Sequence, residues 1–228
     1  MDDERISRRD SLLKFGGLLA GATALGGWKV AEKAGAGPAG VASGEISCVL
    51  APESTEGPFY LDDARVRRNI TEGRPGTPLT LRLRVVDASS CRAIRRATVD
   101  VWHCDAGGAY SGTGSEADER FLRGVQRTDA KGFAVFRTIY PGWYPGRTVH
   151  VHVLVHIAGN VVHTGQLYFP DRLTDTVFRR RPYSRRPGRT TRNAADSIYR
   201  NGGRRSTLVL RRSGWGYVAS ITMGVQRS

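Results

Sequence analysis

The stretch "RTVHVHVLVHIAGNVVHTGQLYFP" occupies residues 147–170 and sets the reading of the fold. Valines alternate with other residues along its first half, which is the two-residue period of a β-strand. Side chains two apart share a face, so His150 and His152 lie together while Val149, Val151 and Val153 face the core. A hairpin turn is expected at Gly159-Asn160.

Further apolar runs outside this stretch favour strands over helices. Residues 78–88 alternate Leu and Val with Thr and Arg, and strand-like runs follow within 91–108, 129–142 and 206–225. The whole chain has 28 Gly and 10 Pro residues, and several of them lie between these runs, as is typical of turns. The sequence therefore predicts an all-β protein, a β-sandwich with long loops. Residues 178–200, rich in Arg and Pro, are expected to be a long irregular loop.

The charge balance is strongly basic. The net charge is +14 and the pI about 10.5, while 39% hydrophobic residues and a mean hydropathy of -0.36 are typical of a globular chain. Twelve Arg and one acid, Asp196, lie between Arg179 and Arg212. No helix-turn-helix, zinc-finger or RNP-like pattern accompanies them. A solvated Arg surface is favoured over a nucleic-acid groove, and no nucleic-acid partner is expected.

The first 42 residues are interpreted as a leader and linker, and residues 43–228 as one β-sandwich domain. "SRRD" at residues 7–10 resembles a twin-arginine export signal, although Ser11 stands where that signal usually has Phe. The apolar stretch 15–28 is short for a membrane span, and small residues near 34–36 and 40–42 offer cleavage sites. We expect secretion by the twin-arginine pathway, without stable membrane association after cleavage. An uncleaved anchor is the alternative.

Three cysteines, Cys48, Cys91 and Cys104, follow the leader. In an oxidising compartment they would give one disulfide and one free thiol. Cys48 with Cys91 is the favoured pair, because Cys104 lies in a strand-like run next to the candidate site. The sequence leaves the pairing open.

Two imidazoles on one strand face favour a metal site over a pair of core histidines, since each buried ring would need hydrogen-bond partners. Tyr110 and Tyr144 lie at glycine-rich turns and could add phenolate ligands. A phenol with a pKa of about 10 releases its proton most readily when its oxygen binds a hard, highly charged cation. Two phenolates and two imidazoles suit Fe(III) better than Zn(II) or Cu(II). The remaining histidines, His103, His156 and His163, are interpreted as surface or supporting residues.

Several motifs together resemble the intradiol ring-cleavage dioxygenases of the catechol, protocatechuate and hydroxyquinol type. They extend from Cys48 to Val225 and read, in chain order, "CVLAPESTEGPFY", "NITEGRPGTPLTL", "VDVWHCDAGGAYSG", "FRTIYPGWYPGRTVHVHV", "TGQLYFP" and "GWGYVASITMGV". The resemblance implies non-haem Fe(III), a catecholic substrate and O2, with ring cleavage to cis,cis-muconate-type products.

The same resemblance implies roles for single residues. Tyr110 matches the equatorial tyrosinate, Tyr144 the axial one that takes up a substrate proton, and His150 and His152 the imidazole ligands. Arg147 falls where the family has an arginine beside the substrate ring, and Gln166 where it has that arginine's polar partner. The family's usual Arg-Pro-Ala-His-Ile-His reads Arg-Thr-Val-His-Val-His here, so the proline of the turn is replaced by Thr148.

Export would expose the protein to catechols released from lignin or other plant phenolics, which are the expected substrates. We expect the chain to lack the helical N-terminal dimerisation segment of catechol 1,2-type members. The sequence determines neither whether the protein forms a homodimer nor which catechol is its substrate. The alternative from another class is an exported, non-catalytic β-sandwich module that binds phenolics or an anionic polymer.

Overall fold

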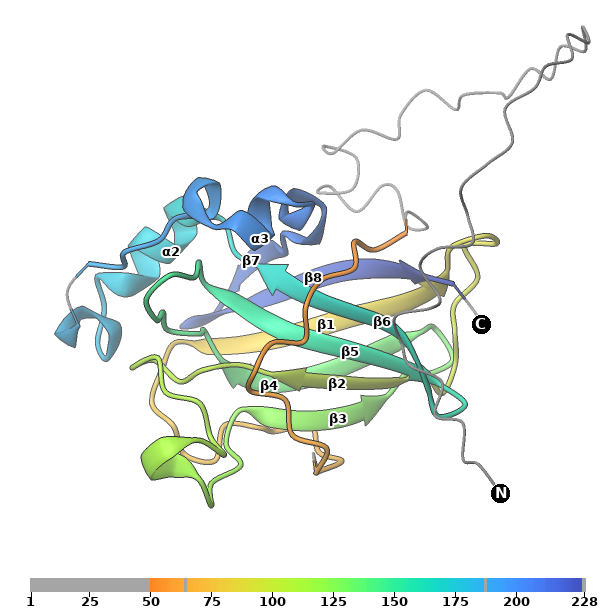
Figure 1. Ribbon diagram of the computed structural model, residues 1–228, viewed down its shortest axis with the longest axis horizontal. Coiled ribbons are helices and arrows are strands. Elements are labelled where there is room, and N and C mark those ends of the chain that lie inside the picture. The colour runs from red at the N-terminus through yellow and green to blue at the C-terminus, as the bar shows by residue number, and fades with distance from the viewer. Residues whose placement is uncertain (1–49, 64, 187, 227–228) are drawn as a thin grey trace, which may run out of the picture. The chain divides into compact units, whose positions relative to one another are not determined.

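The computed structural model describes residues 50–63, 65–186 and 188–226, all within one compact unit. The predicted leader and Cys48 lie outside the described residues. Within these residues, eight strands form two four-stranded sheets, ordered β4-β1-β8-β7 and β3-β2-β5-β6 (Figure 1). Their bounds are β1 Pro78–Asp87, β2 Thr98–Trp102, β3 Arg123–Arg127, β4 Phe133–Ile139, β5 His150–Ile157, β6 Asn160–Tyr168, β7 Val209–Ser213 and β8 Gly216–Val225. The predicted all-β sandwich is confirmed.

The core lies between the two sheets. In β1 every second residue, from Leu79 to Val85, is almost fully buried, while the residues between them reach solvent. In β5, Val151 and Val153 join the same apolar cluster. Both strands therefore turn their alternating apolar residues toward the core, as the sequence predicts, because the inner face of each sheet is buried.

The register of the second sheet aligns polar and aromatic residues on its outer face. Trp102 of β2 pairs with His152 of β5, and His152 pairs in turn with Gln166 of β6. His150 pairs with Tyr168. Partners in antiparallel strands share a face, so three strands bring these side chains together, away from the core.

Residues 50–63 cross the outer face of this sheet as a strap (Figure 1). The Ser54 amide donates to the Thr164 carbonyl at 2.8 Å, and Gln166 Nε2 donates to the Thr55 carbonyl at 2.9 Å. Phe59 and Tyr60 pack on a second, smaller apolar cluster on this face, formed by Trp102, Cys104, Tyr110 and Leu154. The strap thus covers the face that carries the histidines.

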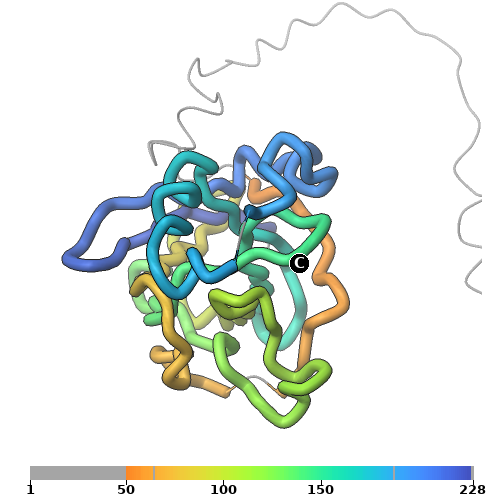
Figure 2. Tube along the Cα trace, turned by 90° about the vertical axis from the view of Figure 1, so that its left-hand side faces the viewer, coloured from red at the N-terminus to blue at the C-terminus, as the bar shows by residue number. Residues whose placement is uncertain are grey.

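Between β6 and β7 the chain forms short helices, where sequence reasoning expected an irregular loop over 178–200. They are α2 Asp171–Phe178, η3 Tyr183–Arg185, η4 Asn193–Ala195, α3 Ser197–Arg200 and η5 Gly203–Ser206. The described residues between these turns are irregular, as expected. The turns themselves were not predicted, because they depend on distant contacts such as the Tyr183 hydroxyl donating to the Tyr140 carbonyl at 2.6 Å. The view along the sandwich shows this helical segment at the same end as the loops that follow β2 and β4 (Figure 2).

Two further details differ from the expectation. The β5–β6 turn is at Ala158 and Gly159, with φ of 50° and 89°, one residue earlier than predicted; two positive φ angles fit the tight hairpin twist. The sequence reading also missed β3, because "RGVQR" has no apolar alternation.

The state of the described cysteines agrees with the expected single disulfide and single free thiol. Cys91 is disulfide-bonded, and Cys104 is a buried free thiol. The helices of the described residues are all too short or too polar to cross a bilayer.

Candidate metal and substrate site

Two loops converge to present the candidate tyrosines, and glycines permit the approach. The Gly142 amide donates to the Asp105 carbonyl at 3.0 Å, and a Cβ on Gly142 would lie 2.4 Å from that carbonyl oxygen. A Cβ on Gly108 would lie 2.2 Å from the Trp143 carbonyl. Side chains at either position would push the loops apart. The contact brings the segment carrying Tyr110 against the one carrying Tyr144.

Four side chains meet between these loops and β5. The Nε2 atoms of His150 and His152 lie 3.1 Å apart, and the Tyr144 hydroxyl lies 3.1 Å from His150 Nε2. The Tyr110 ring lies edge-on to Tyr144 and His152, with centroid distances of 5.7 and 6.2 Å. Tyr110 is 4% exposed, and its hydroxyl has no hydrogen-bond partner among the described residues. The predicted ligand set is thus brought together.

Burial controls the protonation of these groups. Burial, together with the Arg147 charge, lowers the pKa of His150 to about 3, and burial beside His150 holds the pKa of His152 well below its usual value. Both rings are therefore neutral near pH 7, with nitrogen lone pairs available. Burial raises the pKa of Tyr110 well above 10; it also raises that of Tyr144, although the Arg147 charge opposes this rise. A bound cation would reverse the effect on the phenols.

This donor set fits a metal ion. Nitrogens about 2.1 Å from one ion and roughly at right angles would be ~3 Å apart, as the two Nε2 atoms are. Within the described part of the chain no three His, Cys, Asp or Glu side chains form a metal cluster. The potential donors that lie beside the two imidazoles are the phenols of Tyr110 and Tyr144. A buried hydroxyl without a partner, at Tyr110, is otherwise costly.

Arg147 and Gln166 also meet at this site. Arg147 donates through Nη2 to Gln166 Oε1, which also accepts from the Tyr168 hydroxyl at 3.1 Å. Arg147 donates through Nε to Asp196 at 2.9 Å. The guanidinium is therefore held on two sides, beside the tyrosines and histidines.

The other three histidines stand apart. His103 and His163 are 0% and 3% exposed, so a surface location is wrong for both. His103 bonds the Cys104 carbonyl and the Thr138 hydroxyl, while His163 bonds Glu53 of the strap. His156 is half-buried and lines a separate open cavity of about 300 Å³ with Asp62 and Asp100. None of the three contacts the four donors in any recorded hydrogen bond or ring stack among the described residues.

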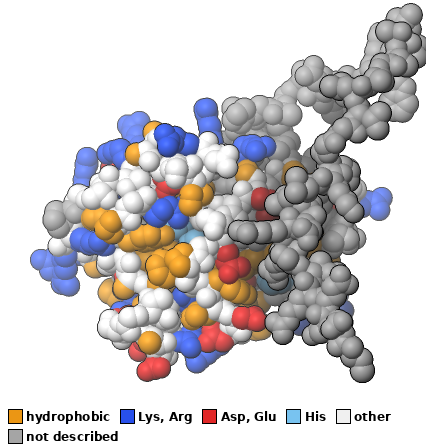
Figure 3. Space-filling model, in the orientation of Figure 1, with side chains coloured by type: hydrophobic (Ala, Val, Ile, Leu, Met, Phe, Trp, Pro, Cys, Tyr) orange, Lys and Arg blue, Asp and Glu red, His pale blue; other side chains and the backbone are white. Residues whose placement is uncertain are grey.

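The sequence assigned no individual role to the residues that enclose the donors. Phe59 stacks on Tyr110 with a centroid distance of 4.3 Å, and Trp102 stacks on His152. Arg186 lies 4.0 Å above the Trp143 ring and donates to the carbonyls of Trp143 and Gly107, joining the two tyrosine loops. Figure 3 shows hydrophobic side chains around a histidine near the middle of the strap-covered face, with Lys and Arg along its margin. Stacking partners leave no motif beyond a lone aromatic, so the sequence carried little signal for them.

Comparisons with known proteins agree with this arrangement. The chain is similar to an intradiol ring-cleavage dioxygenase from Tetranychus urticae, with 32% identity, a TM-score of 0.74, and coverage of 78% of this chain and 95% of that one. It is also similar to the dioxygenase domain of a carbohydrate-binding protein fusion from Streptomyces sp. SirexAA-E, with 32% identity, a TM-score of 0.62, and coverage of 78% and 99%.

Among curated proteins, the chain is 30% identical over 145 residues to the chlorocatechol 1,2-dioxygenase of Cupriavidus pinatubonensis, covering 53% of this chain. It spans just over half, 56%, of that relative's length. The family model described as Dioxygenase matches residues 55–178, more than half of the chain, and includes all four donors, Arg147 and Gln166. The structural neighbours of the chain are intradiol ring-cleavage dioxygenases, and the chain therefore belongs to this dioxygenase family.

Proposed function

We propose that the chain is an Fe(III)-dependent intradiol dioxygenase that cleaves catechols with O2 between the two hydroxylated carbons, giving cis,cis-muconate-type products. The observation that carries this proposal is the convergence of His150 Nε2, His152 Nε2 and the Tyr144 hydroxyl within 3.1 Å contacts, next to the unpartnered phenol of Tyr110. Phenol and imidazole donors match a hard, trivalent iron better than a structural zinc, which usually has Cys and His ligands.

Each residue has a role in this proposal. Tyr110, Tyr144, His150 and His152 would hold the iron, which when bound supplies a Lewis acid that templates the catechol and activates its ring toward O2. Tyr144 is the more exposed of the two phenols and would accept a substrate proton at its hydroxyl oxygen. Arg147 would stabilise negative charge on the ring, and Gln166 keeps the guanidinium oriented.

The test is an oxygen-uptake screen of the iron-loaded protein with catechol, hydroxyquinol, pyrogallol and protocatechuate. The expected result is O2 consumption in step with formation of a ring-opened product, by a red-brown protein whose colour shifts when substrate is added. Colourless, iron-free protein that binds phenols without consuming O2 would instead favour the non-catalytic binding module.

We also propose that the protein is exported and acts on plant-derived phenolics. "SRRD" at residues 7–10 and the disulfide at Cys91 support an oxidising destination. The similar Streptomyces domain is from a cellulolytic bacterium and is part of a carbohydrate-binding protein fusion. Fractionation of a bacterial host that expresses the full chain tests this: Arg8→Lys with Arg9→Lys should retain the protein in the cytoplasm. An equal distribution of the two forms would reject the pathway.

A further inference from the structure

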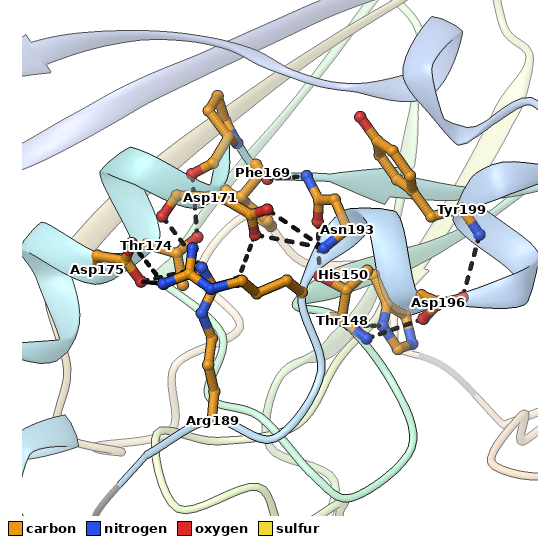
Figure 4. A network of polar contacts seen from close by, with 12 residues as sticks. Thr148, His150, Phe169, Asp171, Thr174, Asp175, Arg189, Asn193, Asp196 and Tyr199 are labelled. Atoms are coloured by element: carbon orange, nitrogen blue, oxygen red, sulfur yellow. Dashed lines mark hydrogen bonds and ion pairs between the residues drawn. The ribbon is translucent and has the colours of Figure 1, made fainter.

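One buried carboxylate, Asp196, joins the helical segment to the candidate site. It is 1% exposed and makes four hydrogen bonds. Its Oδ1 accepts from the amides of Ile198 and Tyr199 at 2.8 and 3.0 Å, which caps α3 (Figure 4). Because both amides belong to one helical turn, they fix the plane of the carboxylate.

The second oxygen of Asp196 faces the site. Oδ2 accepts from Arg147 Nε at 2.9 Å and from the Thr148 amide at 2.8 Å. Burial would raise the Asp196 pKa, but the amides of Thr148 and Tyr199 and the Arg147 charge outweigh it, so the pKa is lowered. The carboxylate is therefore charged, and its bond to the guanidinium is charge-assisted.

Thr148 extends this connection to a donor. Its carbonyl accepts from His150 Nδ1 at 2.6 Å, and its hydroxyl donates to Asn193 at 2.6 Å. A hydrogen on Nδ1 leaves the Nε2 lone pair of His150 directed at the donor set. Asp196 thus holds two consecutive residues, one that faces the substrate region and one that sets the His150 tautomer.

We propose that Asp196 is a positioning residue that fixes the Arg147 guanidinium for the ring-cleavage reaction. This proposal rests on the proposed function. Gln166 holds Nη2 and Asp196 holds Nε, so the guanidinium cannot rotate about its long side chain. A preorganised cation is worth more to a developing negative charge than one that must first be ordered. Capping α3 alone would not require an oxygen directed at Arg147.

The experiment uses Asp196→Asn in the full, iron-loaded chain. Asn is also a good helix cap, so α3 can keep its cap, while the side-chain NH2 then faces two other donors, Arg147 Nε and the Thr148 amide. The expected result is a fall in kcat for catechol of about 10-fold or more with KM changed by ~2-fold at most, because the Arg147 contact strengthens during the reaction. Asp175→Asn is the matched control: its carboxylate pairs with Arg189 and Arg192 instead, and its kcat should equal that of the unmodified chain.

A double variant separates positioning from a general structural effect. Arg147→Lys removes the guanidinium that Asp196 holds. In this variant, adding Asp196→Asn should lower kcat by no more than ~2-fold relative to Arg147→Lys alone. Additive losses, or an Asp196→Asn chain that loses folded protein while turnover per iron is unchanged, would overturn the proposal. If Asp196→Asn does not fold, Asp196→Ser keeps a cap without reaching Arg147 and is judged by the same criteria.

Failure of the proposed function is recognised separately, as absence of catechol turnover by the unmodified, iron-loaded chain. The position of the Arg147 guanidinium in a crystal structure of Asp196→Asn then decides the inference. A guanidinium displaced from Gln166 would support positioning, and an unmoved one would overturn it.

Discussion

The rings of Trp102 and His152 stack with centroids 4.9 Å apart and planes 7° from parallel. His150 has its ring fixed by the hydrogen bond from Nδ1 to the Thr148 carbonyl, whereas His152 Nδ1 has no such partner among the described residues. Gly57 of the strap, at φ 78°, also approaches His152 so closely that a Cβ would lie 3.2 Å from its Cε1. Packing therefore orients the second imidazole, where a hydrogen bond orients the first.

Trp102→Leu is predicted to weaken iron binding by about 10-fold, the usual cost of removing a group that orients a metal ligand. Trp102→Phe should retain most of the affinity, because an aromatic face still supports His152. Iron affinity is measured by competition with a chelator, alongside thermal unfolding. Equal affinity in Trp102→Leu and the unmodified chain would contradict the role of the stack.

His152→Ala should abolish iron loading, since it removes one of two imidazoles from the donor set. The matched control is His156→Ala, on the same strand but paired with Thr98 and Val161 and absent from the donor set. It should keep near-complete iron content. Metal analysis of both purified proteins checks the prediction, and full occupancy in His152→Ala would refute ligation by that residue.

Tyr144→Phe is predicted to retain iron through the other three donors but to lower kcat by roughly 100- to 10,000-fold, the range of general acid–base contributions. The lost hydroxyl can no longer accept a proton from the substrate. Tyr217→Phe, which removes a phenol oxygen from β8 in the other sheet, serves as the control and should leave kcat unchanged. Stopped-flow turnover per bound iron gives the measurement; identical rates would argue against proton uptake at Tyr144.

Acid should destabilise the metal-free fold partly through His103. Burial lowers the pKa of His103 from 6.5 to about 4. Between these values the unfolded chain binds a proton that the folded chain does not, so the free energy of unfolding falls as the pH falls. One such group contributes about 3 kcal/mol across this window.

Denaturant unfolding at several pH values, for the unmodified chain and for His103→Gln, tests this prediction. The variant should lose stability less steeply between pH 6.5 and 4. Burial raises the pKa of Asp100 to about 7, which acts in the opposite direction in both proteins and so cancels in their difference. Parallel curves for the two proteins would show that His103 does not carry the effect.

The sequence by itself determined the strands with clear alternation and the ligand pair on β5. Leu79 to Val85 and Val149 to Val153 are buried as their period predicts, since exclusion of apolar side chains from water acts on each strand locally. The same period places His150 and His152 on one face. The glycine-rich turns pointed to Tyr110 and Tyr144, and the resemblance added Arg147 and Gln166. The structure brings all four residues to that face.

Tertiary structure alone decided what holds those residues. Asp196 meets Arg147 across 49 positions of sequence, and Arg186 meets Trp143 across 43. The short helices between β6 and β7 have no strong local pattern and are stabilised by such distant contacts. From its composition the Arg-rich segment was expected to be a solvated surface. Two of its residues, Arg186 and Asp196, instead bind the loops that carry the donors. A polar side chain's partner depends on the path of the whole chain, which no local period encodes.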